Sequence, residues 1–153
     1  MRSNRRMVGI VAALGLWVSV AWAQDRVPAA GNSTRAERVF CEEKLHGEIW
    51  SRTELYFGLS RSDGPDITDE EFQHFLDTVV TPRFPDGLTL LSGNGQFRGS
   101  SGIVIQEPSK LLILFFPWSN ASNRAIEQIR SIYKGDFHQE AVLRADAESC
   151  VSF

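Results

Sequence analysis

Alternation of apolar and polar residues predicts the first strand over residues 50–60. Leu55, Phe57 and Leu59 fall on one side of this segment, as the period of two in a half-buried strand requires. The other side is polar or amphipathic and carries Trp50, Arg52, Glu54 and Tyr56. A turn is predicted directly afterwards, because RSDGPD is rich in turn-forming residues.

A period of 3.6 then predicts an amphipathic helix that begins after Thr68. Thr68 and Glu71 have the spacing of a capping box, in which each side chain bonds the other residue's backbone N–H. Ile67 and Phe72 are placed to form a hydrophobic staple across this cap. Pro82 is expected to stop the helix, since proline cannot donate to the helical ladder.

The next two apolar segments, residues 88–98 and 103–116, predict a long β-hairpin joined by the turn GSSG. Pro108 lies inside the second arm and predicts a bulge or an edge position there. Residues 111–116 (LLILFF) are apolar on both sides, as in a central strand that is covered on both faces.

A second amphipathic helix is predicted over residues 120–134, with Ile126 and Ile129 facing inward and Gly135 as its C-cap. Alternation over residues 140–151 predicts a final strand. Residues 38–49 are expected to add only a short helical turn before the first strand.

These elements follow the order βαββαβ, which predicts a ferredoxin-like α+β split sandwich. Its antiparallel four-stranded sheet carries two helices on one face. Right-handed crossovers place the first and third strands at the centre, with the last strand antiparallel beside the first.

The N-terminus has the layout of a cleaved signal peptide. Three arginines precede an apolar run over residues 7–20, and an Ala-Trp-Ala cleavage site follows at 21–23. We therefore expect residues 1–23 to be removed and the protein to be periplasmic or secreted. A flexible leader is expected over 24–38 and a single α+β domain over 39–153.

The two cysteines, Cys41 and Cys150, lie near the ends of this domain. In an oxidising compartment such a pair is expected to form a disulfide. The predicted topology agrees, because the end of the last strand falls beside the start of the first.

Charge and composition narrow the classes of partner. Loss of the three signal arginines changes the formal net charge from −3 to −6. An acidic domain of this kind is a poor binder of nucleic acid, and no second apolar run is long enough to span a membrane. His46, His74 and His138 are scattered without zinc-ligand spacing, and no cofactor motif is present, so neither a metal nor a cofactor is expected.

The candidate site lies on the open face of the first strand. Arg52, Glu54 and Tyr56 share that face, and Arg144 and Asp146 of the last strand are expected to join them. Such a group suits a small polar ligand or acid–base chemistry. The simpler alternative is a cross-strand ion pair with an amphipathic aromatic residue, which contributes under ~1 kcal/mol.

The apolar residues 111–116 also predict that something covers the open face. A homodimer through this face, or a ligand cavity between two copies, would bury them.

Several segments, in the same order, resemble a family of small secreted bacterial proteins catalogued as domain of unknown function 3574. They are RTELYFGLS (52–60), VVTPRFPDGLTLL (79–91), GQFRG (95–99), EPSK (107–110) and CVSF (150–153). The resemblance implies an exported single domain and no particular reaction. The polar residues within these segments are the first candidates for a shared site: Arg52, Glu54, Tyr56, Arg83, Arg98, Glu107 and Lys110.

The sequence thus predicts an exported domain that binds a ligand or a protein. The alternative is a small enzyme of the dimeric α/β-barrel type, with Arg52, Glu54 and Tyr56 in its cavity. The candidate binding residues are Arg52, Glu54, Tyr56, Arg98, Lys110 and Arg144.

Overall fold

The computed structural model describes residues 33–61 and 63–153, so the predicted signal peptide and most of the predicted leader lie outside the described residues. The elements in chain order are α1 (Arg35–Lys44), β1 (Glu48–Gly58), α2 (Asp69–Phe75), the π-helical segment η1 (Leu76–Val80), β2 (Thr89–Arg98), β3 (Val104–Phe116), α3 (Asn120–Asp136) and β4 (Leu143–Val151). Over the described ranges, no helix is long and apolar enough to cross a membrane.

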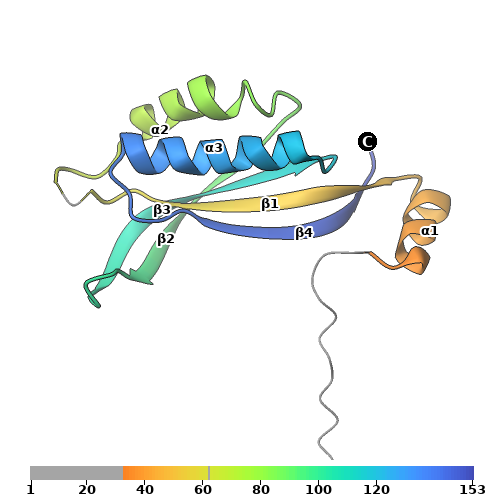
Figure 1. The fold of residues 1–153 in the computed structure, drawn as a ribbon, viewed down its shortest axis with the longest axis horizontal. Coiled ribbons are helices and arrows are strands. Elements are labelled where there is room, and N and C mark those ends of the chain that lie inside the picture. The colour runs from red at the N-terminus through yellow and green to blue at the C-terminus, as the bar shows by residue number, and fades with distance from the viewer. Residues whose placement is uncertain (1–32, 62) are drawn as a thin grey trace, which may run out of the picture.

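The strands form one four-stranded sheet in the order β2-β3-β1-β4, and each neighbouring pair is antiparallel. Helices α2 and α3 both lie over one face of the sheet, and none of the elements in the described residues covers the other (Figure 1). This arrangement confirms the predicted ferredoxin-like α+β class. The register is continuous along all three strand pairs, so alternation assigns every strand residue to the helix-covered face or the open face.

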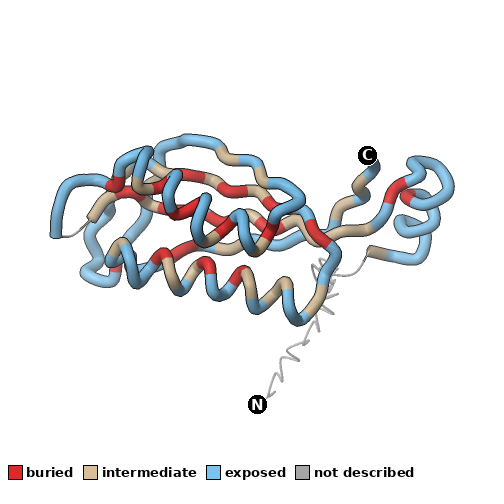
Figure 2. Tube along the Cα trace, turned by 90° about the horizontal axis from the view of Figure 1, so that it is seen from above, coloured by how far each residue is buried: buried red, intermediate tan, exposed pale blue. Residues whose placement is uncertain are grey.

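The core lies between the sheet and the two helices, where the buried segments gather in Figure 2. Leu55 and Phe57 of β1 are fully buried, as the alternation of this strand predicts. The Phe57 ring packs edge-on against Tyr133 of α3, with ring centroids 4.6 Å apart, and against Phe72 and Phe75 of α2. These rings join both helices to the central strand.

The predicted start of α2 is confirmed. The Thr68 side chain accepts from the Glu71 backbone N–H, and the Glu71 side chain accepts from the Thr68 N–H, which completes the capping box. The helix continues through η1 to Val80, two residues before Pro82.

The predicted C-cap of the second long helix is wrong. Gly135 lies inside α3, which extends to Asp136 and has Phe137 as its C-cap. The left-handed backbone conformation that glycine favours is adopted instead by His138, at φ 53°. The Phe137 ring packs on the Tyr133 ring, which supports the two additional helical residues.

Pro108 occupies an edge position. On one side, Pro108 pairs with Asn94 of β2, and the register has no bulge there. On the other side, the pairing of β3 with β1 stops at Gly58–Ser109, so it does not include Pro108. The side of Pro108 that lacks a donor therefore faces the end of β1, where its carbonyl accepts from the Leu59 N–H.

The predicted disulfide is confirmed, and it holds a helix that is longer than expected. Helix α1 begins at Arg35 and packs beyond the end of β1 that is opposite the hairpin tip (Figure 1). Cys41 of α1 is bonded to Cys150 of β4. Gly47 follows this helix, and a β-carbon there would lie 2.6 Å from the Val151 carbonyl oxygen, so glycine permits the close approach of the two segments.

Candidate functional site

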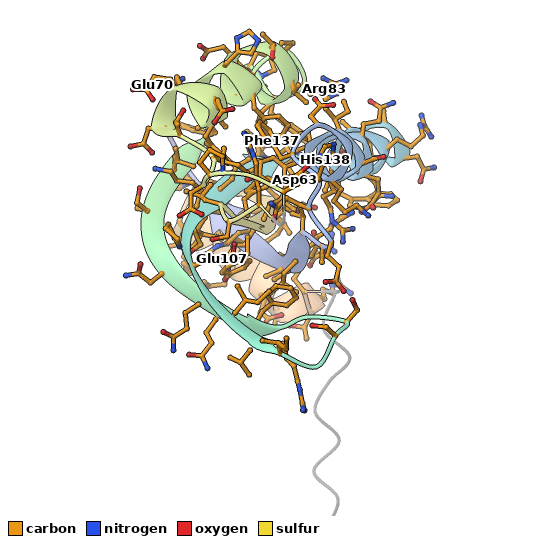
Figure 3. All side chains as sticks on the ribbon, turned by 90° about the vertical axis from the view of Figure 1, so that its left-hand side faces the viewer. Asp63, Glu70, Arg83, Glu107, Phe137 and His138 are labelled. Atoms are coloured by element: carbon orange, nitrogen blue, oxygen red, sulfur yellow. A yellow bond between two sulfur atoms is a disulfide. The ribbon has the colours of Figure 1, made fainter. Side chains whose placement is uncertain are left out.

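A cavity of about 470 Å³ lies on the open face of the sheet, at the end away from α1. The β2–β3 hairpin bends away from the helix layer at this end (Figure 1). Figure 3 looks onto the same end, where the hairpin curves round and Glu107 is labelled. The loop between α3 and β4 supplies the opposite wall through Gln139, Glu140 and Ala141.

The floor of the cavity is nearly free of side chains. Gly93, Ser109 and Gly58 are direct partners across β2, β3 and β1, so they form one row on the open face. Gly95 lies in the next row, opposite Glu107. Glycine in a strand interior weakens the strand and commonly marks a place where a ligand or another backbone approaches closely. Gly58, Gly95 and Ser109 line the cavity, and the Glu107 carboxylate covers Gly58. The peptide planes that a flat group can contact are therefore those around Gly95 and Ser109.

Glu107 is held in place at the edge of this floor. Its Oε2 accepts from the Ser60 backbone N–H at 2.9 Å. Its carboxyl group lies directly over Gly58, and a methyl group at residue 58 would clash with it. Glycine at this position leaves room for the carboxylate in the orientation that the structure shows.

On the other side of the sheet, the Tyr133 hydroxyl donates to the Gly58 carbonyl at 2.8 Å. Burial, and then the negative charge of Glu107, raise the pKa of this hydroxyl above its ordinary value. Tyr133 therefore stays protonated and acts as a hydrogen-bond donor from the core to the backbone beneath Glu107.

The walls of the cavity are largely apolar. Tyr56, Phe97, Ile105 and Leu143 line it, and all four are exposed in this structure. The hairpin tip is fixed to the opposite wall, because the Ser100 N–H donates to the Glu140 carboxylate at 3.0 Å. This bond links the two segments that enclose the cavity.

Two basic side chains lie at the rim, and each pairs with a carboxylate outside the cavity lining. Arg61 Nη2 lies 2.6 Å from Glu71 Oε1, and its guanidinium stacks over the Phe137 ring. The Arg61 hydrogen bond lowers the pKa of the Glu71 carboxyl. His138 Nδ1 lies 2.7 Å from Asp63 Oδ2, and this hydrogen bond lowers the pKa of the Asp63 carboxyl.

The predicted trio on β1 does share the open face, but its members bind one another. Glu54 accepts from the Tyr56 hydroxyl at 2.6 Å and pairs with Arg52 at 2.6 Å. The Arg52 guanidinium also lies over the Phe115 ring. The hydrogen bond to Glu54 raises the pKa of the Tyr56 hydroxyl, so this group is a donor rather than a base. Of the three, Tyr56 alone lines the cavity.

The prediction that Arg144 and Asp146 lie on the open face is wrong. They are the register partners of Leu55 and Thr53, which belong to the helix-covered face. Thr53 donates to Asp146 at 2.7 Å. Arg144 pairs with Asp146 and also with Glu127 of α3, both at 2.8 Å. These residues join the edge strand to a helix.

The remaining candidates lie elsewhere. Lys110 is opposite Phe57 on the helix-covered face, where its Nζ lies 2.6 Å from the Asp69 carboxylate. Arg98 donates to the Gly102 carbonyl at 2.9 Å and so stabilises the hairpin turn. Arg83 donates to the Val79 carbonyl. The structure therefore does not bring the six candidate binding residues into one site.

Sequence reasoning missed the floor of the cavity, although its signal is present. Gly93 and Gly95 are two residues apart in a strand, so both fall on one face, and Gly58 ends a strand in the same sheet. Glu107 is one of the polar residues that the family resemblance singles out. The apolar walls carry no such signal, because they come from separate segments that only the hairpin bend brings together.

The fold and the cavity together define a small ferredoxin-like α+β domain with an open-face pocket. A family model described as "Protein of unknown function (DUF3574)" matches residues 52–153, and the chain belongs to that family. This membership confirms the resemblance found in the sequence. A search of curated proteins finds none that matches the chain significantly.

Two solved structures have a similar fold. A phage SAM lyase in complex with S-methyl-5′-thioadenosine has a TM-score of 0.55 and 16% identity, over 68% of this chain and 90% of that chain. A phage SAM lyase in the apo state has a TM-score of 0.52 and 18% identity, over 68% and 86%. At this identity the likeness shows a shared fold.

Proposed function

We propose that this domain binds a small molecule with a flat, largely apolar body in the open-face cavity. The observation that carries the proposal is the open floor around Gly95 and Ser109, bordered by the Glu107 carboxylate over Gly58 and enclosed by apolar walls. A volume of about 470 Å³ lies within the range of about 300–1,000 Å³ usual for small-molecule sites.

The geometry favours a planar group because a flat ring can lie with one face on the peptide planes of the floor. The walls then contact its edge, and the amide oxygen of Gln139, whose Nε2 already donates to the Ser60 carbonyl, can accept a hydrogen bond that fixes its orientation. The phage SAM lyase is described in complex with S-methyl-5′-thioadenosine, a small molecule with a flat ring system, so a protein of similar fold holds a ligand of this size.

Filling the floor should abolish binding without harming the fold. In Gly95→Val the new side chain projects onto the open face near Ser109 and occupies the cavity. A suitable probe is 2-naphthylmethanol, a neutral molecule with a flat pair of fused rings. We expect its dissociation constant to rise at least about tenfold in this variant, because the ring loses its contact surface. Thermal stability should be equal or higher, because valine suits a strand better than glycine. Chemical-shift titration and thermal melts measure the two effects.

Gly135→Ala is the matched control. Gly135 lies in α3 with no atom within 4 Å of an added β-carbon. This change should stabilise the helix by about 1 kcal/mol and leave binding unchanged. Unaltered binding by Gly95→Val, or equal loss in both variants, would contradict the proposed site.

We also propose that the protein is exported, loses residues 1–23, and pairs through its open face. Support for pairing comes from exposed apolar side chains on that face, among them Leu91, Phe97 and Phe115. Native mass spectrometry of the protein purified from its host without reductant should show a chain that starts near Gln24, with twice the mass of one copy. A full-length or strictly monomeric species would refute the corresponding part of this proposal.

A further inference from the structure

We infer that the ligand of this cavity carries a positively charged group and that Glu107 binds it. The inference rests on the proposed small-molecule function and names the chemical class of that ligand. Glu107 is the carboxylate that covers Gly58 at the edge of the floor, beside the place where a ligand ring is expected to lie. Among residues 33–61 and 63–153, no Lys, Arg or His side chain forms an ion pair with Glu107.

The position of Glu107 is prepared before any ligand arrives. The Ser60 N–H holds Oε2, and the absence of a side chain at Gly58 leaves the space that the carboxylate fills. In the described part of the chain, Oε1 accepts no hydrogen bond from protein atoms, so it is available to a ligand. A carboxylate held in this way binds a charged donor without the cost of ordering its own side chain.

The other charges around the cavity do not cancel that of Glu107. Arg61 is paired with Glu71, and His138 is paired with Asp63, and neither acidic partner lines the cavity. The second carboxylate of the lining, Glu140, accepts from the Ser100 N–H rather than from a cation. The cavity therefore has an excess of negative charge that attracts a cation and repels an anion.

The aromatic lining adds to the same preference. Tyr56 and Phe97 contribute rings to the cavity that Glu107 borders. The face of an aromatic ring attracts a cation through its quadrupole, by about 0.5–1 kcal/mol at exposed sites. An ammonium, sulfonium or similar group attached to a flat ring fits the combination of a bare floor, aromatic walls and one fixed carboxylate.

Three probes with the same ring separate the effect of charge from that of shape. They are 2-naphthylmethylamine, which is a cation at neutral pH, 2-naphthylmethanol, which is neutral, and 2-naphthoate, which is an anion. With the mature, disulfide-bonded protein we expect the amine to bind about tenfold more tightly than the alcohol, and the anion most weakly, as measured by chemical-shift titration at low and moderate salt.

Glu107→Gln should remove this preference. The amide oxygen can still accept from the Ser60 N–H, so the shape of the cavity is kept while the charge is lost. The amine and the alcohol should then bind within about twofold of each other. The control is Glu70→Gln on α2, which changes the net charge equally but lies in the helix layer, at a distance from Glu107 (Figure 3), and should preserve the preference.

The outcomes distinguish the two proposals. Equal binding of amine and alcohol by the unmodified protein, or tighter binding of the anion, overturns the charge preference and leaves the proposed function standing. An amine preference that persists in Glu107→Gln, or that disappears equally in Glu70→Gln, shows that Glu107 is not its source. Failure of all three probes to bind contradicts both proposals. The ranking by the unmodified protein holds even if a variant fails to fold.

Discussion

Replacement of both Cys41 and Cys150 by alanine is expected to lower the free energy of unfolding by about 4–5 kcal/mol. The disulfide joins residues 109 positions apart and therefore encloses almost the whole domain in one covalent loop. Without it, the unfolded chain gains the conformational entropy that the loop removes, while the folded state keeps its core. Alanine is the appropriate replacement because Cys41 is buried.

Urea unfolding of the double variant, compared with the oxidised protein, measures this loss. Reduction of the unmodified protein should reproduce most of it. Limited proteolysis should cut first in α1, which lies beyond the end of the sheet and is linked to β4 by the Arg38–Glu148 ion pair and, just before the helix, by the Ser33 backbone N–H, which donates to the same carboxylate. A decrease below about 1 kcal/mol would show that the disulfide does not restrict the unfolded chain in this way.

Phe57→Ala is expected to cost about 3–5 kcal/mol, the usual range for removing a fully buried aromatic ring. The Phe57 side chain is 0% exposed and contacts rings from both α2 and α3, so its removal leaves a cavity where the sheet and both helices meet. The surrounding rings belong to different elements and cannot all move inward to fill it.

The matched control is Phe153→Ala at the C-terminus. The Phe153 side chain is fully exposed and touches one ring, that of Trp50. Its loss should change stability by less than about 0.5 kcal/mol. Denaturant midpoints of the two variants test the contrast, and similar values for both would mean that Phe57 does not lie in the core.

The sequence predicts the central elements well because each has a strong local signal. Alternation in β1 assigns Leu55 and Phe57 to the core, and the Thr68–Glu71 capping box places the start of α2. The topology follows from the order of elements, and it brings Cys41 and Cys150 together. These features depend on short-range patterns and on the restricted ways in which such elements connect.

The wrong predictions concern the face of β4 and the end of α3, where the local sequence pattern is compatible with two structures. In β4 small and polar residues alternate with one another, so the pattern does not say which side faces the helices, and a shift of one residue exchanges the faces. The packing of Arg144 against Glu127 settles the matter only in three dimensions. The end of α3 is similar, since glycine is typical of a C-cap but Phe137 packing carries the helix past Gly135.

The candidate site is harder to predict than the fold. The trio on β1 is visible as a polar face, but its charges are satisfied within the trio. The cavity depends on a bend in the hairpin and on Ser100 reaching Glu140, and neither has a sequence signature. The sequence does contain one sign of the cavity, the glycines Gly93 and Gly95 in one strand. An analysis of apolar and polar positions overlooks it, because glycine has no side chain to classify.

Along strand β1, every second residue faces the core, and the residues between them face the open side of the sheet. Leu55 and Phe57 contact the helices, whereas Tyr56 and Gly58 line the cavity. Mutations that reshape the cavity and mutations that lower stability therefore fall on alternate positions, so evolution can change one property while conserving the other. Gly58 is the exception. Its carbonyl accepts a hydrogen bond from Tyr133 in the core, and its lack of a side chain leaves space for the Glu107 carboxylate at the cavity, so both stability and the shape of the cavity constrain this one residue.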